Sequence, residues 1–175
     1  MDASSALFLD EQTVLEIAGI VGALVAGLGY YFRSRLTESR RTVLAGCLLG
    51  GTLFLCMWII RQLLLDPGLN DMRGEFAGSV DVLIFSAALV VFCIIMAGMT
   101  LPALWLFSRG LLVSPTLGLF AVTYNVFWAM FTVSHESNSI IIHFGLVFPI
   151  ILVGTLLLAG LEFGVLRITG HYSSR

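Results

Sequence analysis

Five long apolar runs restrict the possible folds of this chain more than any other feature of its sequence. They span residues 13–32, 42–65, 81–107, 111–133 and 140–166. Each run is close to the ~20 residues that a helix needs to cross ~30 Å of hydrocarbon. A membrane β-strand would alternate apolar and polar residues over about ten positions, whereas these runs are apolar on all sides. We therefore predict an all-α, polytopic integral membrane protein folded as a five-transmembrane-helix bundle.

The composition agrees with this class over the whole length of the chain. Hydrophobic residues make up 58% of the 175 residues and charged residues 11%, against about 25% charged residues in an ordinary soluble domain. The mean hydropathy is +1.00, and no stretch has the composition of a separate soluble domain. We expect residues 1–175 to form a single transmembrane domain, multi-pass in the cell membrane, with the lipid bilayer as its first partner.

The arginines predict the orientation of the bundle. The chain has nine basic residues, all of them arginine. Four lie between the first two runs: Arg33, Arg35, Arg40 and Arg41. Basic residues near span ends are retained on the cytoplasmic side. With the N-terminus outside and the C-terminus cytoplasmic, only Arg61 and Arg73 lie outside, so the four clustered arginines are topology anchors. Glu38 interrupts the cluster and no aromatic side chain is interleaved, which argues against nucleic acid as a partner.

Small and polar residues recur at helical spacing in three of the runs. Such residues let membrane helices approach closely and form hydrogen bonds between helices. We predict that these faces meet protein, either within the bundle or on a partner membrane subunit or a second copy. The stripes are Glu16, Gly19, Ala23, Gly27 and Tyr30 in the first run, Gly46, Gly50, Phe54, Met57 and Arg61 in the second, and Ser114, Gly118, Ala121, Asn125, Ala129 and Thr132 in the fourth.

Two of these stripes contain a charged residue near the outer end of a predicted span. Glu16 and Arg61 each lie roughly 5–6 Å below the same boundary, at 1.5 Å per residue. Charges in lipid are costly unless they are paired or hydrated, and a guanidinium can bind a carboxylate through two hydrogen bonds. We predict a structural ion pair between Glu16 and Arg61. The alternative is that each side chain reaches the headgroups separately.

Asn125 and Glu162 are further polar residues inside predicted spans. Asn125 is near the bilayer centre, where it either forms an interhelical hydrogen bond or lines a permeation path. Glu162 lies about one turn from the inner end of the last span, 200° around the helix from Gly160. The Gly160 and Glu162 faces therefore serve different neighbours. Glu162 is expected to be hydrated, to face Arg109 or to act in proton transfer.

One cluster of polar residues is a candidate for chemistry at the outer surface. His135, Glu136 and His143 are of the types that bind transition metals or transfer protons. The two histidines are eight residues apart with a break between loop and helix, so no fixed geometry follows. The alternative is one hydrated loop histidine and one interfacial histidine, and no metal site is assigned.

The sequence lacks the residues of several enzyme classes. Without lysine there is no Schiff-base site and no P-loop lysine, and HExxH and G-x-S-x-G are also missing. No cofactor is predicted, although a quinone or haem held partly by a partner subunit stays open.

We expect a non-catalytic subunit, scaffold or assembly factor that packs against partner membrane helices. The alternatives are an oligomeric transporter or channel with a polar path near Asn125 and Glu162 and, third, an intramembrane or outer-face enzyme.

Overall fold

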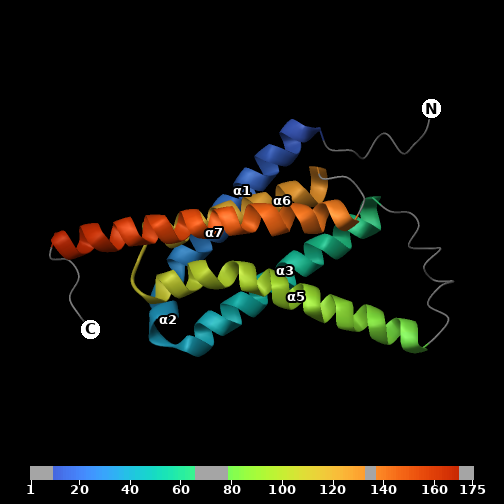
Figure 1. Cartoon of the computed structure of the whole chain (residues 1–175), viewed down its shortest axis with the longest axis horizontal. Helices are drawn as coiled ribbons and strands as arrows, with labels where there is room; N and C mark the ends of the chain where they lie inside the picture. Colours follow the sequence, from blue (N-terminus) through green and yellow to red (C-terminus); the bar gives the residue numbers. More distant parts are fainter. Residues whose placement is uncertain (1–9, 66–78, 133–136, 170–175) are drawn as a thin grey trace.

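The computed structural model describes residues 10–65, 79–132 and 137–169, and all regular structure in these ranges is helical (Figure 1). The helices are α1 (Glu11–Tyr31), α2 (Arg33–Glu38), α3 (Arg40–Leu65), α5 (Ser79–Ser108), α6 (Val113–Thr132) and α7 (Ser137–Ile168). The all-α prediction is confirmed over these ranges, and each of the five apolar runs corresponds to one long helix. Three segments have the length and composition to cross a membrane: Glu11–Tyr31, Arg40–Met57 and Gly145–Ile168. Cys93–Ser108 is apolar but shorter.

The arginine-rich connection between the first two runs is not an extended loop. Residues Arg33–Glu38 form the short helix α2, which follows directly on α1. Leu36 is the buried residue of this helix, and it packs with side chains of α3, α5 and α6. Because charged residues flank Leu36, the sequence did not indicate that Leu36 would be buried.

Helix α1 does not pack on the long helix that follows it in the chain. The main partner of α1 is α6, whereas α3 packs along α5, and α6 also packs on α7. The α1–α6 contact is close because Gly22 faces Phe120: a Cβ atom at Gly22 would lie 3.0 Å from the Phe120 ring. Helices α1 and α3 therefore do not pack against each other as a hairpin. Instead, α1 packs on α6 and α3 packs on α5.

Two glycines set the closest approaches elsewhere in the bundle. A Cβ atom at Gly51 of α3 would lie 2.7 Å from the carbonyl oxygen of Cys93 in α5. One at Gly118 of α6 would lie 2.6 Å from the Cγ2 atom of Thr155 in α7. Small residues thus bring these backbones together, as is typical of helices packed in membranes.

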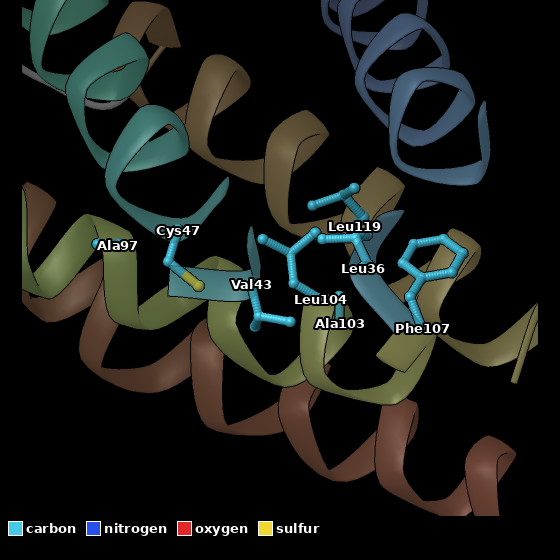
Figure 2. Close-up of a cluster of buried hydrophobic side chains, with 8 residues drawn as sticks. All are labelled: Leu36, Val43, Cys47, Ala97, Ala103, Leu104, Phe107 and Leu119. Atoms are coloured by element: carbon cyan, nitrogen blue, oxygen red, sulfur yellow. The ribbon is translucent and has the colours of Figure 1, made fainter. Parts of the chain in front are cut away.

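The core is built from two main clusters of buried apolar side chains. One includes Phe54, Met96, Val126 and Met130, from α3, α5 and α6. The other joins α2, α3, α5 and α6, and Figure 2 shows its side chains converging. The members of this second cluster are Leu36, Val43, Cys47, Ala97, Ala103, Leu104, Phe107 and Leu119.

A tight turn joins α5 to α6 and places the start of α6. Gly110 has a φ of 81°, in the left-handed region that glycine adopts without strain. The Gly110 N–H donates to the Phe107 carbonyl at 2.9 Å, and the Leu111 N–H donates to the Leu106 carbonyl at 3.3 Å. The turn brings the first N–H groups of α6 beside the C-terminal half of α7.

Candidate functional site

Glu162 of α7 binds the N-terminus of α6. Its Oε1 accepts hydrogen bonds from the backbone N–H groups of Leu112, at 2.6 Å, and Val113, at 3.0 Å. Its Oε2 accepts from the N–H and the hydroxyl of Ser114, at 2.8 and 2.7 Å. The first N–H groups of a helix have no partner within the helix, and the helix dipole favours a negative charge there. This polar residue inside a span therefore holds two helices together.

The sequence identified Glu162 but not its partner. It suggested water, Arg109 or a proton-transfer role, whereas the four donors belong to a segment about fifty residues earlier. One signal does exist in the sequence. Leu112 precedes α6, and leucine cannot cap a helix through its side chain, so the helix needs an acceptor from elsewhere. The prediction that the Gly160 and Glu162 faces serve different neighbours stays a prediction: Glu162 meets α6, whereas a Cβ placed at Gly160 or Gly164 would meet no neighbouring helix of the described chain within 4 Å.

Two of the three predicted small-residue stripes face the protein interior. In α3, a Cβ at Gly46 would lie 3.1 Å from Leu104 and one at Gly50 would lie 3.2 Å from Thr100. In α6, Gly118 packs on α7, and the stripe includes further buried members. Those members are Ser114 and Ala129.

The predicted stripe on α1 lies outside the bundle instead. Glu16, Ala23 and Gly27 are exposed, and no described atom lies within 4 Å of a Cβ at Gly19 or Gly27. The face of α1 that packs on α6 is a second small-residue stripe. It consists of Val14, Ala18, Gly22 and Ala26.

The predicted Glu16–Arg61 ion pair stays a prediction. Glu16 is exposed, and its Oε1 accepts a hydrogen bond of 3.3 Å from the Gln12 amide. The Arg61 side chain lies outside the described residues. Coupling between the two would appear as non-additive effects of Glu16→Gln and Arg61→Gln on stability, and additive effects would refute it.

Of the other predicted polar residues, the structure describes the side chain of Asn125 but not those of the outer histidines and Glu136. Asn125 lies in the middle of α6 and is half-buried, and the choice between a hydrogen bond and a polar path stays open. His135 and Glu136 lie outside the described residues, as does the side chain of His143. Among the side chains that the structure describes, no three His, Cys, Asp or Glu residues are placed to hold a metal ion.

The clustered arginines lie at one end of the bundle. The Arg33 guanidinium is 4.0 Å from the centre of the Tyr30 ring, and that of Arg109 is 4.8 Å from the Trp105 ring, both within the range of cation–π contacts. Arg40 and Arg109 border an open pocket of about 710 Å³ between the start of α3 and the end of α5. The structure thus brings together arginines that the sequence placed in two separate connections.

A second cavity, which the sequence did not predict, lies between α1 and α3. Its volume is about 290 Å³, and helices α5 and α6 form its floor. Apolar side chains and glycines line it, together with two threonines, Thr100 and Thr123. The Thr100 hydroxyl donates to the Ala97 carbonyl at 2.9 Å. The Thr123 hydroxyl is buried and has no hydrogen-bond partner among the described residues.

Comparison with known proteins returned no match: no family model fits the chain, and no curated protein or solved structure is significantly similar.

Proposed function

We propose that this chain is a non-catalytic subunit of a membrane complex, and that the outer face of α1 packs against a membrane helix of its partner subunit. The observation that carries the proposal is the outward-facing stripe of Glu16, Gly19, Ala23 and Gly27, in which Gly19 is half-buried and the other three residues are exposed. Membrane helices associate where small residues let their backbones approach. Because α1 already packs on α6 through its other small-residue face, the outer face is free for a second helix.

The proposal includes the topology predicted from the sequence. The chain crosses the cell membrane five times, with its N-terminus outside and its C-terminus in the cytoplasm. The gathering of Arg33, Arg40 and Arg109 around α2 and the α5–α6 turn supports a common cytoplasmic end. Glu16 then lies near the outer end of the docking face, where it is available to a polar group of the partner.

The hydrogen bonds of the Glu162 carboxylate favour a role as a subunit over a role as a transporter. Both of its carboxylate oxygens are engaged with the start of α6. An ion or proton relay through Glu162 would have to break these contacts in every cycle. The carboxylate is therefore better suited to holding the bundle than to moving a charge.

Co-purification in a mild detergent tests the proposal. We expect Gly27→Leu to reduce the amount of co-purified partner, relative to the tagged chain, by about fivefold or more, because about 1 kcal/mol of lost packing lowers the association constant about fivefold. The matched control is Gly98→Leu on α5, another exposed glycine with no described atom within 4 Å of its Cβ position. This variant should retain the partner.

Three results would contradict the proposal. Equal partner recovery with both variants would show that the α1 face has no role. Recovery of a second copy alone, lost in Gly27→Leu, would replace the partner subunit by a homo-oligomer. Flux through liposomes containing only the purified chain would favour the transporter alternative.

A further inference from the structure

The cavity between α1 and α3 exists because these two helices pack on different neighbours. Val21, Val25 and Gly29 form its α1 side, and Leu49 and Leu53 belong to its α3 side. These α1 residues lie about half a turn from Gly19, Ala23 and Gly27, at 3.6 residues per turn. The cavity is therefore on the other side of α1 from the proposed docking face, and substitutions can address the two surfaces separately.

Thr123 is the exceptional polar group of this cavity. Threonines in these helices commonly donate to a carbonyl three or four residues earlier. Those that do so are Thr37, Thr52, Thr100, Thr116, Thr132, Thr155 and Thr169. Thr123 is 0% exposed, and its Oγ1 has no partner among the described residues. A buried hydroxyl without an acceptor costs about 1–3 kcal/mol, so an acceptor supplied by a bound molecule would be stabilising.

The depth of Thr123 restricts what such a molecule is. Thr123 is one turn from Phe120, which packs on Gly22 in the middle of α1. Gly22 is roughly 16 Å from the first residue of this helix, at 1.5 Å per residue. The ester carbonyls of a phospholipid lie near the headgroups, and moving them to this depth would bring a charged headgroup into hydrocarbon. The acceptor must belong to an uncharged molecule that is soluble in the bilayer interior.

A partner helix does not supply this acceptor. One turn of a helix, with a diameter of about 10–12 Å and a pitch of about 5.4 Å, fills roughly 400–600 Å³, whereas the cavity holds about 290 Å³, so a helix backbone cannot enter it. A carbonyl compound with an apolar chain meets both requirements, because its chain matches the apolar lining and its carbonyl oxygen accepts from Thr123.

We propose that the α1–α3 cavity binds an uncharged, lipid-soluble carbonyl compound of the quinone class, with a carbonyl oxygen accepting a hydrogen bond from Thr123. Because the Thr123 hydroxyl is enclosed in the structure, binding requires the Thr123 side chain to rotate toward the cavity. The ring then lies beside Thr123 and Thr100, and the apolar chain leaves along Leu49 and Leu53 toward the lipid. The proposal adds a ligand to the subunit and does not depend on the partner that the outer face of α1 binds.

Quenching of tryptophan fluorescence by decylubiquinone tests the proposal, with the full chain in phospholipid nanodiscs. Trp128 packs against the cluster that contains Phe54, which also lines the cavity, so a bound quinone ring lies near an intrinsic reporter. We expect saturable quenching. Because the nanodisc already presents phospholipid chains in large excess, saturation means that the probe displaces them.

Two pairs of variants locate the site. Leu49→Phe should fill the cavity and weaken binding about tenfold or more, whereas Leu48→Phe should leave it unchanged. Leu48 and Leu49 are 58% and 63% exposed, but only Leu49 lines the cavity. Thr123→Val keeps the shape and should weaken binding about two- to tenfold, in line with one lost hydrogen bond. Thr52→Val, on the exposed side of α3, should have no effect.

The proposal is overturned by any of three results. The first is quenching by the wild type that does not saturate. The second is equal loss of binding in Leu49→Phe and Leu48→Phe, which would place the probe elsewhere. The third is unchanged affinity in Thr123→Val when Leu49→Phe abolishes binding, which would leave an apolar cavity that selects no carbonyl. None of these results bears on partner recovery by Gly27→Leu, so this proposal and the proposed function fail separately.

Discussion

At the scale of single residues, Glu162 is the clearest case of a polar group whose position was evident and whose partner was not. A carboxylate inside an apolar run must have a compensating group, and this much follows from the sequence. The donors are backbone N–H groups, which every residue except proline carries, so composition cannot identify them. Only the Gly110 turn, which orients the start of α6 toward α7, determines which N–H groups are unpaired and close.

Replacement of Glu162 by glutamine should therefore lower the stability of the bundle. The amide would direct N–H donors at groups that are themselves donors, and a hydrogen bond to a charged group is worth about 1.5–3 kcal/mol. We expect Glu162→Gln to reduce the free energy of unfolding by about 2 kcal/mol or more, measured by titration with sodium dodecyl sulfate in mixed micelles.

Ser114→Ala provides the graded control for Glu162→Gln. It removes the hydroxyl donor but leaves the three backbone donors of the site, so it should cost only about 1 kcal/mol. Its effect should largely vanish in the Glu162→Gln background, because the two groups share one contact. Strictly additive losses, or an unchanged unfolding midpoint in Glu162→Gln, would contradict the capping role.

At the scale of helices, the positions of the five long elements were predictable and the pairing of α1 was not. Length follows from the thickness of the hydrocarbon layer, so each apolar run indicated one helix. Pairing depends on which small-residue face is used, and α1 has two. The stripe through Gly19 and Gly27 was selected from the sequence, whereas the stripe through Ala18 and Gly22 packs on α6. Both have the same spacing, and only the shape of the neighbouring helix separates them.

The α3–α5 contact gives the sharpest test at this scale. Gly51→Ala would place a Cβ atom 2.7 Å from the Cys93 carbonyl oxygen and 3.0 Å from Ala97. Overpacking of this kind costs about 1–3 kcal/mol, and we expect a corresponding loss in the free energy of unfolding. Gly98→Ala on α5 meets no described atom within 4 Å and should be neutral or slightly stabilising, since alanine favours helix. Equal effects of the two variants would show that α3 and α5 are not in close contact at Gly51.

At the scale of the whole molecule, the arginines relate the fold to the bilayer. The sequence places them in connections far apart along the chain, and the structure brings Arg40 and Arg109 to the border of one pocket at one end of the bundle. The proposed orientation rests on these arginines, because basic residues near span ends are retained in the cytoplasm. The packing of the helices does not determine this orientation, so the proposal depends on the charges alone.

Cysteine labelling of intact cells tests that orientation directly. The background would carry alanine at the three native cysteines, Cys47, Cys56 and Cys93. With a membrane-impermeant maleimide, Asp10→Cys just before α1 should be labelled in intact cells. Thr37→Cys, on the exposed side of α2, should be labelled only after permeabilisation. The opposite pattern would place the arginine end outside, and the proposed partner would then meet Glu16 from the cytoplasmic side of the membrane.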